Sequence, residues 1–202
     1  MARKRTNTER VLDLVRQSGV IRVRDLTARG IHPEYLRRLC SRGLLVRVAR
    51  GVYVSGEADV SSEHALALAA KSVPHGVVCL LSALRFHDLG TQDPHQVWLA
   101  IDGKARLPRV RYPRLRIVRA SGEPLAAGVE EHTVDRVPVR IYNPAKTVAD
   151  CFKYRNKTGL DVALEALRDC WRQRRATMDE LWQYAKICRM TNVMRPYLEF
   201  LT

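Results

Sequence analysis

The residues of this sequence best suited to a chemical role are arginines on one predicted helix, residues 33–42. Leu36, Leu39 and Cys40 recur at helical spacing and predict the buried face of this helix. At about 100° per residue, the other side of the helix carries Glu34, Arg37, Arg38, Ser41 and Arg42. An arginine guanidinium can contact O6 and N7 of guanine together, and it also pairs with phosphate. This pattern predicts a helix that binds double-stranded DNA through these five side chains.

The segments around this helix predict a winged helix-turn-helix over residues 1–56. A capping box of Thr6 and Glu9 starts a first helix that Gly19 ends. The remaining elements are expected at 20–22 (extended), 23–29 (short helix), 33–42 (helix, with Pro33 in its first turn), and 44–48 and 51–54 (strands). In this architecture the third helix enters the major groove, and the hairpin wing reaches the flanking backbone or the minor groove.

Two further groups of basic residues are expected to contact DNA outside the helix. Arg47 and Arg50 lie on the predicted wing, and Arg3, Lys4 and Arg5 form an N-terminal arm. We expect these side chains to bind phosphates or to line the minor groove. Contacts of this kind position a protein on the duplex and do not read its sequence.

The distribution of charge favours a polyanionic partner for the N-terminal segment. The chain has 35 Lys and Arg and 21 Asp and Glu, a net charge of +14. Residues 1–56 hold 13 of these bases and 4 of these acids, a net charge of +9. A dense basic patch attracts nucleic acid through Coulomb forces and counterion release. Two alternatives remain open, namely a solvated arginine-rich face and a winged helix that binds another protein.

Residues 57–202 predict a mixed α/β domain, so that the whole chain is of the α+β class. Gly56–Asp59 is the expected linker. Helices are expected from Ser61 or Ser62, over most of 76–89 with a strand start as the alternative, from Asn143, and over 160–171 and 181–188, which places helices at the C-terminal end. Strands are expected at 97–101, 115–118 and 137–141, the last at a sheet edge because of Pro138.

The loop at 102–114 carries five basic side chains and has two possible interpretations. It is either a solvated loop or a secondary contact with nucleic acid. Its basic residues are Lys104, Arg106, Arg109, Arg111 and Arg114.

No catalytic pattern emerges from the sequence, so we predict neither an enzyme nor a bound cofactor or metal. The six histidines have no ligand spacing, and the 11 glycines form no phosphate-binding loop. His87-Asp88 resembles a metal-phosphohydrolase dipeptide, but a helix-end cap is the better interpretation. Asp150 and Glu165 are expected as solvated carboxylates on the polar faces of their helices.

The cysteines and the hydropathy pattern predict a cytoplasmic protein without a membrane span. The five cysteines lie far apart in the sequence, which favours buried reduced thiols over disulfides or a zinc site. No apolar run reaches the roughly 20 residues that a transmembrane helix needs. The basic N-terminus leads into a polar, helix-starting segment and not into the apolar core of a signal peptide.

Three stretches of the sequence together resemble the AbiEi family, the antitoxins of type IV abortive-infection toxin–antitoxin systems. They are residues 10–14 continuing to 51–53, residues 82–89 (SALRFHDL) and residues 143–153 (NPAKTVADCFK). The resemblance implies a winged helix that represses its own operon by binding inverted repeats. It also implies a C-terminal domain that contributes to cooperative DNA binding and counteracts a co-encoded nucleotidyltransferase toxin without a stable complex.

Not every expectation from the family transfers to this chain. Some AbiEi relatives carry a nuclease-like C-terminal domain with clustered carboxylates, and this sequence has no such cluster. A stand-alone regulator without antitoxin activity and a winged-helix protein-interaction module are the alternative functions.

Overall fold

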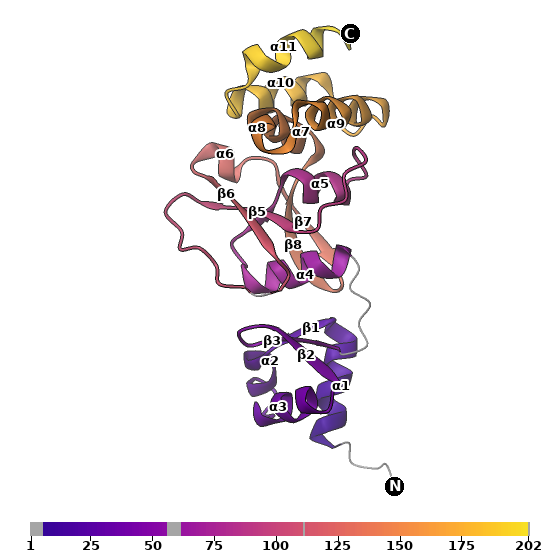
Figure 1. Cartoon of the computed structure of the whole chain (residues 1–202), viewed down its shortest axis with the longest axis vertical. Helices are drawn as coiled ribbons and strands as arrows, with labels where there is room; N and C mark the ends of the chain where they lie inside the picture. The colour runs from indigo at the N-terminus through magenta and orange to yellow at the C-terminus, as the bar shows by residue number, and fades with distance from the viewer. Residues whose placement is uncertain (1–5, 56–61, 111, 202) are drawn as a thin grey trace. The chain divides into compact units, whose positions relative to one another are not determined.

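The computed structural model describes residues 6–55, 62–110 and 112–201 of the chain (Figure 1). The expected linker at Gly56–Asp59 and the basic residue Arg111 lie outside the described residues. The chain forms two compact units. The first comprises Met1–Pro74, Pro108–Arg114 and Thr133–Val139, and the second comprises His75–Leu107, Leu115–His132 and Arg140–Thr202. The predicted domain boundary between residues 56 and 57 stays a prediction.

The N-terminal part of the first unit contains the predicted order of helices and strands. These elements are α1 (Asn7–Ser18), β1 (Val20–Arg22), α2 (Val23–Thr27), α3 (Glu34–Ser41), β2 (Leu45–Ala49) and β3 (Val52–Ser55), followed by α4 (Ser62–Ser72). The strands form an antiparallel sheet in the order β1-β3-β2. Residues 20–22, which the sequence indicated only as extended, therefore form β1, an edge strand of this sheet.

Helix α1 begins where the capping box predicts and packs one apolar stripe into the core. The Thr6 hydroxyl accepts from the Glu9 N–H at 3.2 Å, and the Glu9 carboxylate accepts from the Thr6 N–H at 2.7 Å. Val11 and Val15 of α1 are buried in one cluster with Leu26 of α2. These contacts set the framework on which α3 lies.

A five-stranded mixed sheet lies further along the chain. Its strands are β4 (Val77–Val78), β5 (Val97–Asp102), β6 (Leu115–Ala120), β7 (Val129–Val134) and β8 (Val137–Tyr142), in the order β6-β5-β4-β8-β7. Strand β4 is antiparallel to β5 and parallel to β8, and β5 is parallel to β6. The chain thus combines helices with an antiparallel sheet and a mixed sheet, which confirms the α+β class.

One sequence expectation for this sheet was wrong. Strand β8 is an inner strand, although Pro138 suggested an edge. The proline is accommodated because β4 pairs with β8 only near Ile141. Residues 77–78 form a strand, the alternative that the sequence left open, since they pair with Leu99 and Ala100 of β5, and the expected helix follows them. The β7 strand had no sequence signal that we recognised.

Helices α7 to α11 lie together at the C-terminal end of the second unit (Figure 1). The helices that follow α4 in the chain are α5 (Leu80–Phe86), α6 (Glu123–Ala126), α7 (Pro144–Lys153), α8 (Arg155–Thr158), α9 (Leu160–Arg172), α10 (Met178–Ile187) and α11 (Thr191–Glu199). Asn143 caps α7 by accepting from the Lys146 N–H at 2.9 Å, as its position before Pro144 predicted. The core of this unit joins the inner faces of α5, α7, α9, α10 and α11 to β5 and β6. Within the described residues, no helix has the length and apolar character that crossing a bilayer requires.

Candidate nucleic-acid interface

Helix α3 is held in place by the leucines on its inner face. Leu36 and Leu39 are each 1% exposed, and they pack into the cluster that contains Val11, Leu26 and Ile31. The burial of two leucine side chains at i and i+3 fixes the rotation of the helix about its own axis. The opposite face of α3 is therefore presented to solvent.

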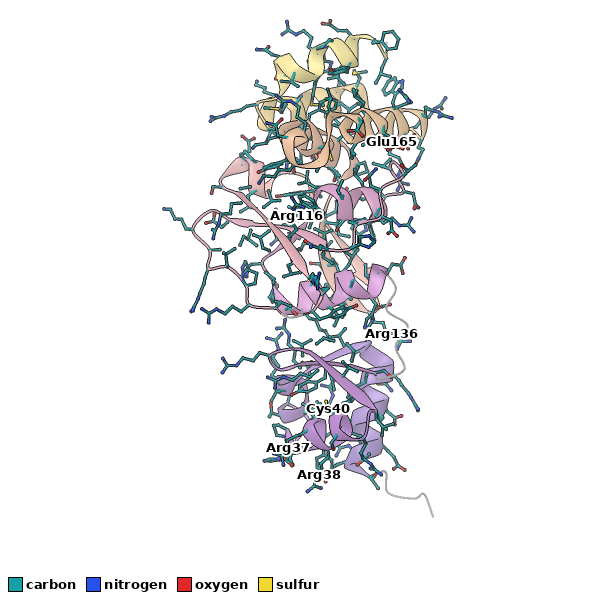
Figure 2. All side chains as sticks on the ribbon, viewed as in Figure 1. Arg37, Arg38, Cys40, Arg116, Arg136 and Glu165 are labelled. Atoms are coloured by element: carbon teal, nitrogen blue, oxygen red, sulfur yellow. The ribbon has the colours of Figure 1, made fainter. Side chains whose placement is uncertain are left out.

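The outer face of α3 carries the predicted arginines. The side chains of Arg37 and Arg38 are 84% and 69% exposed, and both extend away from the helix (Figure 2). Ser41 and Arg42 are also exposed, and Glu34 is partly buried. The sequence pattern thus predicted correctly that Arg37, Arg38, Ser41 and Arg42 face solvent, whereas Glu34 is only partly exposed.

Glu34 forms ion pairs with both exposed arginines of its own helix. Its carboxylate lies 3.3 Å from Arg37 and 4.0 Å from Arg38. Exposed pairs one turn apart are worth only about 0.3–0.5 kcal/mol, because water screens them and the side chains lose freedom. These pairs orient the guanidinium groups and leave them accessible to a phosphate or a base edge.

Local contacts further order the outer face of α3. The Arg38 guanidinium lies 5.9 Å from the centre of the Tyr35 ring, a cation–π contact. The Ser41 hydroxyl donates to the Arg38 carbonyl at 2.8 Å. At the start of the helix, the Glu34 N–H donates to Nδ1 of His32 at 3.2 Å. No signal in the sequence indicated this role of His32, because histidine is not a usual N-terminal cap.

The β2–β3 hairpin places two more of the predicted residues at the surface. Arg47 lies in β2 and Arg50 in the turn, and both side chains are exposed. Gly51 in the same turn has φ +75°, a conformation that side-chain-bearing residues rarely adopt. The register shifts between Arg47 and Ala49, which marks a bulge in β2. The hairpin is the element that a wing requires.

The N-terminal arm of the prediction, Arg3, Lys4 and Arg5, lies outside the described residues. Among the residues that the structure does describe, Arg42 and Arg50 have no carboxylate within ion-pair distance. Together with Arg37 and Arg38, they give the surface an excess of positive charge that Glu34 offsets only in part.

The second unit contains a buried polar cluster that the sequence did not predict. Asp150 was expected as a solvated carboxylate, but its side chain is only 7% exposed and the side chain of Lys146 is 1% exposed. Lys146 Nζ donates to Asp150 Oδ2 at 2.5 Å, and the Cys188 thiol donates to Oδ1 at 3.3 Å. The Lys146 ammonium also lies 4.1 Å from the centre of the Tyr142 ring. The expectation for Asp150 was wrong because α10 and Cys188, the residue that follows it, cover the face of α7 that helical periodicity assigns to solvent.

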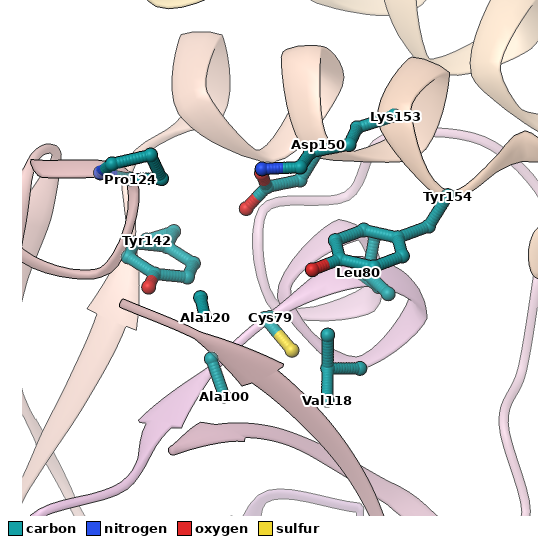
Figure 3. A pocket seen from close by; sticks show the side chains of 10 residues that line it. All are labelled: Cys79, Leu80, Ala100, Val118, Ala120, Pro124, Tyr142, Asp150, Lys153 and Tyr154. Carbon is teal, nitrogen blue, oxygen red and sulfur yellow. The ribbon is translucent and has the colours of Figure 1, made fainter. Parts of the chain in front are cut away.

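This cluster borders a small pocket that Figure 3 shows from close by. Asp150, Tyr142 and Tyr154 line the pocket, and its volume of about 10 Å³ admits a single water molecule. Burial raises the pKa of the Cys79 thiol well above its usual range and that of Cys188 to about 12. Thiols held in the protonated form are poor nucleophiles. The cluster is thus better suited to stability than to catalysis.

The His87-Asp88 dipeptide lies at the end of α5. His87 is buried and donates from Nε2 to the Tyr142 carbonyl at 2.8 Å, while the Asp88 side chain is exposed. The two side chains therefore lie in different environments, as the helix-end interpretation implies. In the described part of the chain, no three metal-ligating side chains converge.

The N-terminal elements also match a protein family. Residues 9–56 match the family of transcriptional regulators described as AbiEi antitoxins. The AbiEi segment, as we call residues 9–56, contains α1, α3 and the β2–β3 hairpin, and it accounts for about a quarter of the chain.

The comparison with solved structures supports the fold beyond the AbiEi segment. The chain is similar to a crystal structure of the RV2827C protein from Mycobacterium tuberculosis, with a TM-score of 0.65 and 18% sequence identity. The similarity covers 92% of this chain and 73% of that chain. At this identity the likeness concerns the fold alone. A comparison with curated proteins finds no match.

Proposed function

We propose that residues 1–56 form a winged helix-turn-helix that binds double-stranded DNA, and that the chain is an autorepressor and antitoxin. In this proposal α3 enters the major groove, where Arg37, Arg38 and Arg42 contact base edges and phosphates. Arg47 and Arg50 on the hairpin, with the arm Arg3–Arg5, bind the flanking backbone or minor groove. Glu34 and Ser41 complete the surface.

One observation carries this proposal. The exposed arginines occupy the outer face of the only helix that a winged helix-turn-helix presents to the major groove, and buried leucines fix that face. The family of the AbiEi segment, transcriptional regulators that are antitoxins, supports the same conclusion.

The antitoxin role rests on the family and not on a site in the structure. We propose that the target DNA is the protein's own operator with inverted repeats. The functional partner in this proposal is a co-encoded nucleotidyltransferase toxin, which the protein counteracts without forming a stable complex. The protein would then act by binding and not as an enzyme.

A charge-matched pair of variants tests the DNA interface. In the first variant Arg37, Arg38 and Arg42 are replaced by alanine. In the control, Arg168, Arg172 and Arg195, which are exposed on α9 and α11, are replaced by alanine, so the net charge changes equally. We expect the first variant to lose the footprint on the upstream region of its gene and the control to retain it.

Equal DNA binding by both variants would remove α3 from the interface. A stable complex with another protein that covers residues 33–50, without affinity for any duplex, would instead favour the protein-interaction module.

A further inference from the structure

The first unit contains a second cationic feature, a cavity of about 240 Å³ lined by α1, β1, α2 and α4. Its walls include Leu14, Gln17, Ile21, Asp25, Arg29 and Lys71. A cavity of this volume holds several water molecules or one small ligand. The wall combines apolar side chains with two cations and one carboxylate, so charged groups converge on this space.

Lys71 is the most unusual residue of this wall. It is half-buried, and its ammonium donates to the Val20 carbonyl. Among the described residues no carboxylate lies within ion-pair distance of this ammonium. Burial lowers the pKa of Lys71, the nearby carboxylate of Asp25 opposes this shift, and Arg22 and Arg24 reinforce it. A cation in this environment lacks a counter-charge in direct contact.

Asp25, the one carboxylate in the cavity wall, already has partners for both of its oxygens. Its Oδ2 accepts from the Arg22 N–H at 2.7 Å, and its Oδ1 lies 4.0 Å from Nε of Arg24. Nε of Arg22 is buried without a hydrogen-bond partner in the described structure. The guanidinium of Arg136 adds a further cation, because it donates to the Gln17 carbonyl at 2.5 Å. Positive charge therefore exceeds negative charge around the cavity.

We propose that this cavity binds a small anion that carries a phosphate or carboxylate group. The anionic group pairs with Lys71 and Arg29, and the Gln17 amide and the apolar wall of Leu14 and Ile21 contact the rest of the ligand. Binding supplies the counter-charge that the wall lacks. No residue of this site belongs to the outer face of α3.

The position of Arg29 connects the site to α3. Arg29 lies after α2, where its N–H donates to the Leu26 carbonyl at 2.9 Å and its guanidinium donates to the Asp25 carbonyl. The Ile31 N–H donates to the same Leu26 carbonyl at 3.0 Å, within the turn that leads to α3. A ligand held by Arg29 thus acts on this turn. This regulatory consequence, unlike binding itself, rests on the proposed function.

Inorganic phosphate is the probe for the first experiment, which uses the full chain without DNA. Calorimetric titration and thermal unfolding compare phosphate with chloride at equal ionic strength. Phosphate also stabilises proteins by exclusion from their surface, so the readout is the difference between variants. Lys71→Gln is compared with Lys186→Gln, a change of an exposed lysine on α10.

We expect the wild type and Lys186→Gln to bind phosphate alike, and Lys71→Gln to bind it at least tenfold more weakly. Arg29→Gln is a second variant that keeps the test valid if Lys71→Gln does not fold, and we expect the same loss. Equal phosphate binding by Lys71→Gln, Arg29→Gln and the control would overturn the proposal.

A second experiment separates this inference from the proposed function. Affinity for the upstream duplex is measured with and without phosphate at constant ionic strength. A phosphate effect that Lys71→Gln abolishes supports regulation through the cavity. If the chain binds phosphate but no duplex, the site stands and the proposed function fails. If it binds the duplex without any phosphate binding that depends on Lys71, the inference fails and the proposed function stands.

Discussion

At the scale of single residues, basic side chains have opposite roles in the two units. Arg37 and Arg38 lie in water, where their pairs with Glu34 contribute little to stability and where they are available to a partner. Lys146 lies in the core, where its pair with Asp150 is screened by little water. Changes at Arg37 and Arg38 should therefore alter DNA binding, and changes at Lys146 or Asp150 should alter stability.

Arg38→Ala tests the binding role of one exposed arginine. If Arg38 contacts a base edge, we expect the variant to lose about 1–3 kcal/mol of binding free energy and to discriminate less between operator variants. Fluorescence anisotropy on the operator and on single-base-pair substitutions measures both quantities. An equal loss of affinity on all DNA sequences would indicate that Arg38 contacts a phosphate instead.

Asp150→Ala tests the buried ion pair. The variant leaves the Lys146 ammonium buried without its partner, so we expect unfolding free energy to fall by about 3–5 kcal/mol. Urea denaturation measures the change, with Asp161→Asn at an exposed position of α9 as the control. A loss below about 1 kcal/mol would show that the buried pair contributes little to stability.

His87 makes stability depend on pH in a definite direction. Burial lowers its pKa, with His132 and Arg175 acting in the same sense, against the Tyr142 hydrogen bond and Glu130. The unfolded chain therefore binds a proton more readily than the folded one. Stability is complete above the unfolded pKa of about 6.5 and decreases as the pH falls below it.

We expect the unfolding free energy of the wild type to decrease between about pH 7 and pH 5 more steeply than that of His87→Gln. Urea denaturation at several pH values measures both curves. Parallel curves for the two proteins would exclude a contribution from His87.

At the scale of elements, α3 combines a structural face and a binding face. Leu36 and Leu39 are buried, and the arginines between and beside them are exposed. Because the two faces are separate, substitutions can change stability and DNA binding independently.

Leu39→Ala and Arg37→Ala separate the two faces of α3. We expect Leu39→Ala to lower unfolding free energy by about 2–5 kcal/mol through the cavity it leaves. Arg37→Ala should stay within about 0.5 kcal/mol of the wild type and still weaken DNA binding. Thermal unfolding and a DNA titration on each variant provide the comparison. A strongly destabilised Arg37→Ala would contradict the division.

At the scale of the whole molecule, the net charge of +14 governs how binding responds to salt. Each phosphate that the protein neutralises releases counterions, so the logarithm of the affinity falls linearly with the logarithm of the salt concentration.

If about 5–7 phosphates are neutralised, we expect a slope on the order of −4 to −6 in a plot of log affinity against log salt. Titrations at four or more salt concentrations measure the slope. Replacing Arg50 should reduce its magnitude by about one, because that side chain is expected at a phosphate. A slope near zero would argue against a polyanionic partner for this surface.

The sequence alone predicted the elements whose signals are local. The capping box at Thr6 and the spacing of Leu36 and Leu39 sufficed for the start of α1 and the solvent-facing side of α3, because a helix places residues on its faces by geometry alone. The cap at Asn143 followed from residue type in the same way.

Only the tertiary structure decided the features that depend on residues distant in sequence. Strand β4 forms because β5 and β8 pair with it, and β8 is an inner strand because β7 takes the outer place. Asp150 is buried because Cys188 and Lys146 meet its two oxygens. An argument from helical periodicity assumes that a helix buries one face against one neighbour. Helix α7 packs against neighbours on several sides, and all of them determine which of its residues are buried.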